Sequence, residues 1–112
     1  MSEECELVTM MSVVRGRCEL TTTYIYFFDA SPVKEGAERH DNRWAVTSLR
    51  EVYLRRFNLR KSALEFFLLD QTNFFINFPS FKKRNKVYLK IWGLKLPNLV
   101  YHGTRQGYMY IF

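Results

Sequence analysis

Apolar and polar residues alternate with a period of two through the middle of the chain, most clearly in residues 63–68 and 73–78. This period predicts two strands with one face turned toward a core. Asp70 to Asn73 supply turn-forming residues between them, so the two strands are expected to form a hairpin. The side chains predicted to point inward are Leu64, Phe66, Leu68, Phe74, Ile76 and Phe78.

Short apolar runs also occupy the first 30 residues. Residues 7–14 are apolar up to Arg15-Gly16, and residues 17–22 then alternate again, which predicts a tight hairpin turning at Arg15-Gly16-Arg17. Residues 24–29 are rich in Tyr, Ile and Phe and predict a third strand.

The composition becomes polar over residues 30–43, which predicts one long loop. A short strand is expected at 44–46 and a longer one at 49–58, where apolar and polar positions alternate again.

After residue 80 the apolar positions change to helical spacing. Ser80 is the expected N-cap, Gly93 the expected stop, and Pro97 prevents continuation. Trp92 is expected to plug the open end of a small β-barrel or sandwich, because a large side chain near the helix end can fill that opening. The residues on the inward side are Val87, Tyr88, Ile91, Trp92 and Leu94, and those facing water are Lys82, Lys83, Lys86 and Lys90.

At 112 residues the chain fits one domain, and 47% hydrophobic residues are enough to build its core. A net charge of +6 favours acidic partners, whether nucleic acid, anionic lipid or an acidic protein surface. Cys5 and Cys18 lack metal or redox spacing, and the acidic first residues do not resemble a secretory signal. We therefore expect a cytoplasmic protein, with peripheral association with endomembranes left open.

Four sequence segments together carry a family resemblance. They are LREVYLRRFNLRKSALEFF at 49–67, DQTNFFINF at 70–78, CELVT at 5–9 and RNKVY at 84–88. They resemble the pleckstrin-homology-like domain that precedes the BEACH domain in proteins of the neurobeachin family.

The resemblance implies a mainly β fold, a seven-stranded antiparallel barrel or sandwich capped by one C-terminal helix, here expected at 4–96 with a linker or tail at 97–112. It also implies a non-catalytic module without cofactors, which packs against the BEACH domain of the same protein in a scaffold for vesicle traffic that includes other trafficking proteins. The family lacks the usual inositol-phosphate pocket. Residues 105–112 depart from the family pattern, and are either an artificial end or a native alternative one.

A basic and aromatic run in residues 50–61 suggests a docking face, because Arg and aromatic residues are enriched at interface centres. The alternative is a solvated strand face. Alternation also places Phe67 and Phe75 outward, where another domain could cover them, although exposed aromatics are also ordinary. The partner-binding candidates are Arg50, Glu51, Tyr53, Arg55, Arg56, Arg60, Phe67 and Phe75.

Other binding chemistry has less support in the sequence. Arg15 and Arg17 form a candidate lipid site, but two arginines in a tight turn predict at most weak contact with anionic membranes. His40 and His102 lack partners at metal-ligand spacing, and no catalytic motif is present. No nucleic-acid partner is expected, because the stacking motifs of RNA-binding sheets are missing.

Overall fold

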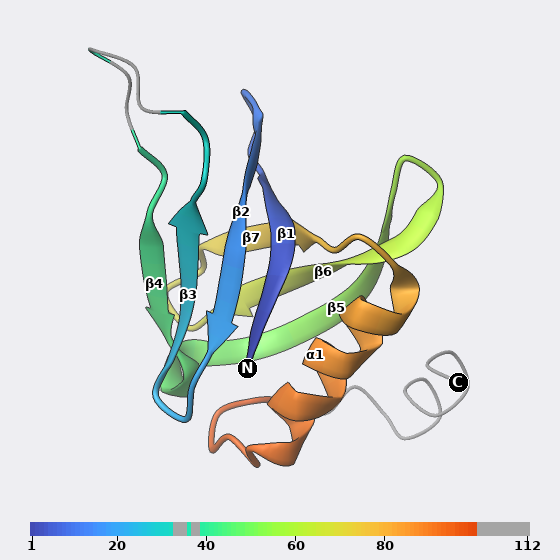
Figure 1. The fold of residues 1–112 in the computed structure, drawn as a ribbon. Helices are drawn as coiled ribbons and strands as arrows, with labels where there is room; N and C mark the ends of the chain where they lie inside the picture. Colours follow the sequence, from blue (N-terminus) through green and yellow to red (C-terminus); the bar gives the residue numbers. More distant parts are fainter. Residues whose placement is uncertain (33–35, 37–38, 101–112) are drawn as a thin grey trace.

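The computed structural model describes residues 1–32, 36 and 39–100, and shows seven antiparallel strands followed by one α-helix (Figure 1). This order is the one predicted from the sequence. Most of the predicted tail at 97–112 lies outside the described residues, and His102 lies outside them too. The elements are β1 (Ser2–Val8), β2 (Val13–Leu20), β3 (Tyr24–Asp29), β4 (Asn42–Ala45), the 3-10 turn η1 (Val46–Ser48), β5 (Leu49–Phe57), β6 (Arg60–Leu68), β7 (Asn73–Asn77) and α1 (Phe81–Gly93).

The strands form one sheet in the order β4-β3-β2-β1-β7-β6-β5. Strand β1 pairs with β2 on one side and with β7 on the other, so it joins the two hairpin-built halves of the sheet. Within the described residues no ladder connects β4 to β5. In Figure 1 the sheet is strongly curved, and α1 lies across its lower end.

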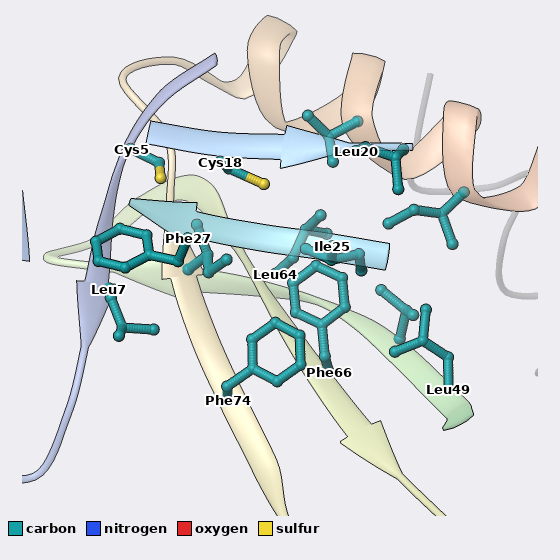
Figure 2. Close-up of a cluster of buried hydrophobic side chains, with 14 of the residues drawn as sticks. Cys5, Leu7, Cys18, Leu20, Ile25, Phe27, Leu49, Leu64, Phe66 and Phe74 are labelled. Atoms are coloured by element: carbon teal, nitrogen blue, oxygen red, sulfur yellow. The ribbon is translucent and has the colours of Figure 1, made fainter. Parts of the chain in front are cut away.

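The core consists of the inward side chains of both halves, and the predicted inward set of β6 and β7 is buried. Phe74 is central, since its ring stacks on Trp44 of β4 at 3.7 Å between centroids and on Phe66 at 4.4 Å. Figure 2 shows Phe66 and Phe74 side by side, in the same buried cluster as Ile25 and Phe27 of β3. The rings therefore connect the two halves of the sheet across the interior.

The β5–β6 hairpin differs from the prediction in its turn. Its strands continue to Phe57 and resume at Arg60, so only Asn58 and Leu59 form the turn, both with positive φ (50° and 66°). Positive φ at both central residues is the geometry of a type I′ hairpin turn. Arg60 and Lys61 consequently belong to β6 rather than to a loop.

The β1–β2 hairpin corrects a second prediction. The turn lies at Thr9–Ser12, and the Arg15-Gly16-Arg17 segment is extended strand in the middle of β2. A Cβ on Gly16 would lie 2.6 Å from Cζ of Phe27 and would also collide with the carbonyl oxygen of Phe28. Gly16 is therefore required by close packing of β2 on β3, and not by a turn.

The helix begins where predicted, because the Ser80 hydroxyl accepts a hydrogen bond from the backbone N–H of Lys83 at 3.3 Å. Trp92 is not its main plug. Ile91 is fully buried, whereas Trp92 is only half-buried, with its ring edge-on to Tyr88 at 6.0 Å. Ile91 is therefore part of the core itself, whereas Trp92 packs against the core and remains partly exposed.

Replacing Gly16 by Ala should destabilise the fold by about 1–3 kcal/mol, because the added methyl forces β2 away from Phe27. Urea unfolding of the wild type and the variant measures this difference. Gly93→Ala is the matched control, since a Cβ there meets nothing within 4 Å. Equal midpoints for wild type and Gly16→Ala would contradict the packing account.

Candidate functional site

The surface of β5, β6 and β7 that points away from the core carries aromatic and charged side chains side by side. We call this surface the outer face. It consists of Glu51, Tyr53, Arg55 and Phe57 from β5, Glu65 and Phe67 from β6, and Asn73 and Phe75 from β7. Both predicted outward phenylalanines, Phe67 and Phe75, lie on it half-buried.

Arg55 is the centre of this face. Its Nε donates to Oε1 of Glu65 at 2.8 Å, and its guanidinium lies 4.6 Å from the centroid of the Tyr53 ring. The Tyr53 ring in turn meets Phe67 edge-on at 5.5 Å. The other oxygen of Glu65 accepts from Asn73 at 2.9 Å. Each side chain thus fixes the position of the next, so the outer face is ordered before any partner binds.

A second acidic group completes the network at the start of β5. The hydroxyl of Tyr53 donates to Oε2 of Glu51 at 2.5 Å, and this bond together with burial raises the pKa of Tyr53. Arg50 lies 3.1 Å from the other Glu51 oxygen. The phenol therefore stays protonated and acts as a hydrogen-bond donor within the face.

Three of the predicted docking residues do not lie on the outer face itself. Arg50 occupies a register irregularity between Leu49 and Glu51 and joins the network only through Glu51. Arg56 is exposed, lies in the register irregularity between Arg55 and Phe57, and takes no part in the contacts that join Arg55, Glu65 and Tyr53. Arg60 lies beyond the hairpin turn, in a different surface groove.

Arg84 of α1 holds the strand that carries Arg55. Its Nη1 donates to the backbone oxygen of Arg55 at 3.2 Å, and its Nε donates to Oδ1 of Asn85 at 3.0 Å. The side chain is almost completely buried, and desolvation lowers its pKa. Sequence reasoning missed this role, because a charged residue between lysines on a helix looks solvent-exposed.

The groove that contains Arg60 runs along β1 and β2. Arg15 and Arg17 line it together with Arg60 and His40, so residues from three parts of the chain meet there. Its volume of about 1060 Å³ is at the upper limit of the roughly 300–1,000 Å³ of small-molecule pockets, and it is open to solvent. The groove is therefore a broad, shallow surface rather than an enclosed pocket.

A chain of polar side chains crosses the floor of this groove. The hydroxyl of Ser62 donates to Oδ1 of Asn77 at 2.6 Å, and Nδ2 of Asn77 donates to Oε1 of Glu6 at 3.0 Å. Glu6 lies opposite Arg15 in the β1–β2 ladder. The bonds link β6, β7 and β1 and hold the groove in one shape.

Asp29 organises the loop at the groove's far wall. Its carboxylate accepts hydrogen bonds from the hydroxyl and the N–H of Ser31 and from the N–H of His40, the last at 2.9 Å. These bonds, above all that of the Ser31 hydroxyl, hold the pKa of Asp29 well below its ordinary 3.8 although the group is buried. His40 thus has a structural position beside Asp29, at 3.6 Å.

Aromatic residues on β3 form a second outward group that the sequence analysis did not single out. The rings of Tyr24, Tyr26 and Phe28 follow one another at 5.7 and 5.6 Å between centroids. The guanidinium of Arg43 lies 4.6 Å from the centroid of Tyr24. Alternation within residues 24–29 would have revealed this row.

Other chemistry is not assembled in the described part of the chain. No cluster of three or more His, Cys, Asp or Glu side chains suited to a metal occurs there. A hydrogen bond to Cys18 and burial raise the pKa of the Cys5 thiol, so it is protonated and unreactive. Among these same residues, no helix is long and apolar enough to cross a membrane.

Comparison with known proteins now places this arrangement in a family. The model of the PH domain associated with Beige/BEACH matches residues 5–92, which is most of the chain. The chain belongs to this family. The BEACH-associated PH domain thus includes every strand from Cys5 onward and α1 as far as Trp92.

Solved structures agree on the fold of this PH domain. The C-terminal domain of an unknown protein from Leishmania infantum has a TM-score of 0.69 at 12% identity, covering 84% of this chain and 80% of that one. The Slm1-PH domain in complex with phosphoserine has a TM-score of 0.64 at 13% identity, covering 84% and 92%. The same domain with inositol-4-phosphate has a TM-score of 0.62 at 15% identity, covering 84% and 94%. At such identities the likeness establishes the pleckstrin-homology fold alone.

Asp29→Asn should cost about 1–3 kcal/mol of stability near neutral pH, because it weakens several hydrogen bonds to a buried carboxylate. The pKa of Asp29 is lower in the folded state than in the unfolded state, so as pH falls the unfolded state binds a proton first. The contribution of the ionised carboxylate to the free energy of unfolding is therefore complete well above pH 3.8 and declines as the pH falls below it. Urea unfolding at several pH values should show the gap between wild type and variant narrowing in acid. A gap that does not change with pH would contradict this assignment.

Proposed function

We propose that this PH domain is a non-catalytic interaction module that docks onto the BEACH domain of its own full-length protein through the outer face. The observation that carries the proposal is the pre-arranged set of Arg55, Tyr53 and Phe67 on one surface. Arg and Tyr are the residue types that anchor interface centres, since they combine apolar area with directed hydrogen bonds.

The energetics of the face also favour docking. Glu65 is only 19% exposed in its side chain and Arg55 42%, so part of their desolvation has already occurred in the isolated domain. Side chains that are already held in place lose less conformational entropy when a partner covers them.

Family membership supports the choice of partner, because the matched family is defined by its association with BEACH. Within that proposal, residues 4–96 form the docking module and residues 97–112 the linker or tail. A neurobeachin-like parent protein, a cytoplasmic location and a role in a vesicle-trafficking scaffold with other trafficking proteins belong to the same proposal.

Arg55→Ala and Phe67→Ser should each weaken binding to a separately expressed BEACH domain by roughly tenfold or more, as truncation of an interface centre does. Isothermal titration calorimetry measures the dissociation constants. Arg56→Ala is the matched control, because it removes an exposed arginine from the adjacent position of β5 that takes no part in the contacts of Arg55 described above.

The thermal midpoint of each variant separates lost binding from lost folding. The Arg55–Glu65 pair is partly exposed, so its removal should alter stability by about 1 kcal/mol or less. Equal affinities for the Arg55 and Arg56 variants would remove the outer face as the docking surface.

A second candidate function is weak binding of phosphoinositides or anionic membranes, favoured by the convergence of Arg15, Arg17 and Arg60 on one groove. The Slm1-PH domain, whose solved structures contain phosphoserine and inositol-4-phosphate, gives the fold a precedent for anionic ligands. Glu4 and Glu6 line the groove too, which offsets part of its positive charge and keeps the expected binding weak.

Replacing both Arg15 and Arg17 by Ala should lower association with phosphoinositide-containing vesicles several-fold, and rising salt should lower the association of the wild type. Vesicle co-sedimentation measures both effects. Arg43→Ala removes an arginine that contacts Tyr24 and is not among the groove-lining residues, and it should leave association unchanged. Equal association with neutral vesicles would reject the electrostatic groove.

A further inference from the structure

Two hairpin turns present apolar side chains to solvent at their tips. In the β1–β2 turn, Met10 and Met11 are fully exposed, and in the β5–β6 turn Leu59 is 90% exposed. Neither feature has a role in the core or on the outer face. In Figure 1 both turns project upward, away from α1, which lies across the lower end.

The β1–β2 turn holds its methionines outward by a set of hydrogen bonds. The N–H of Thr9 donates to the carbonyl of Ser12 at 2.8 Å, and the Thr9 hydroxyl accepts from the N–H of Met11 at 3.3 Å and of Ser12 at 3.0 Å. Threonine and serine side chains that bond back to the chain stabilise turns in this way. The two methionines are thus displayed by a closed turn.

Leu59 is displayed at a cost to the fold. Its φ of 66° lies in the left-handed region, which favours glycine and disfavours a side chain such as leucine. The preferred sequence of a type I′ turn is Asn-Gly, and here leucine follows Asn58. A residue that is both strained and exposed contributes nothing to folding at this position.

Positive charge surrounds these tips. Arg56, Arg60 and Lys61 flank Leu59 and are exposed, and Arg15 is exposed on β2 behind the methionine turn. Ser12 and Arg60 line the same groove, so the two hairpins border one surface depression. The apolar points therefore lie at the two edges of a groove that also contains arginines.

We propose that Met10, Met11 and Leu59 insert into the interfacial layer of an anionic bilayer while the flanking arginines and Lys61 contact its headgroups. This inference deepens the anionic-membrane candidate described above and names the apolar part of that contact. Apolar side chains flanked by basic side chains are the combination that binds anionic membrane interfaces.

A bilayer suits the tips better than a protein surface does. Protein interfaces need a continuous, shape-matched patch with a dry centre. The exposed apolar groups here are convex and separate, and they have polar residues between them. A fluid headgroup layer accepts protruding side chains without a matching shape, so lipid is the occupant that the geometry favours.

The test compares flotation of the 112-residue chain with vesicles of phosphatidylcholine alone and with added phosphatidylserine. Wild type should bind the anionic vesicles. The bound fractions of a Met10→Ser/Met11→Ser variant and of Leu59→Gly should each be lower by roughly fivefold or more. Leu59→Gly should at the same time keep or raise the thermal midpoint, because glycine relieves the positive φ. Reduced binding by a variant of equal or greater stability cannot come from misfolding.

Leu89→Ser is the matched control, since it removes an exposed apolar side chain from α1, away from both turns, and should bind like wild type. A direct readout is the fluorescence of Met11→Trp, which should shift to the blue on anionic vesicles beyond any shift of the wild type.

The arginine variants test the groove, and the tip variants test the apolar insertion, so the two proposals can be rejected independently. If Arg15 and Arg17 are needed but the Met and Leu59 variants bind like wild type, the tip inference is overturned and the anionic groove remains. No binding of wild type to anionic vesicles would overturn both. Loss of binding in the tip variants, with Arg15 and Arg17 dispensable, would support insertion and reject the groove.

Discussion

The double pairing of β1 is the constraint on which the rest of the structure depends. Leu7 lies opposite Val14 of β2 on one side and Ile76 of β7 on the other, so one strand joins halves that are distant in sequence. This pairing places the arginines of β2 near the start of β6 and creates the groove. Strands β5, β6 and β7 turn one side to the core. Their opposite side forms the outer face, which is separate from the groove.

The second half of the fold could be predicted because its sequence contains little ambiguity. Leu64, Phe66 and Leu68 alternate with polar or outward residues without interruption, and Asp70 marks the turn that follows. The same alternation correctly placed Phe67 and Phe75 outward. It did not resolve Arg56, since alternation assumes an uninterrupted ladder and the register of β5 with β6 shifts between Arg55 and Phe57.

The first hairpin could not be placed for a different physical reason. Methionine is apolar, so Met10 and Met11 extend the predicted strand although they occupy a turn, and Gly16 looks like a turn residue although it makes room for Phe27. Glycine serves both purposes, and only the three-dimensional contact decides between them. The flanking Thr9 and Ser12, both able to bond back to the backbone, were the local signal for the true turn.

Apolar and aromatic side chains at the surface of this domain occur in two physically different settings. On the outer face Tyr53 and Phe67 are half-buried within a network of ion and ring pairs, and such a surface matches one rigid partner. At the hairpin tips Met10, Met11 and Leu59 have no such network, and Leu59 is kept in an unfavourable backbone conformation. A bilayer does not require shape matching, and Met10, Met11 and Leu59 are not among the residues of the outer face. The two proposed contacts, with the neighbouring domain and with a membrane, therefore use different residues of this domain.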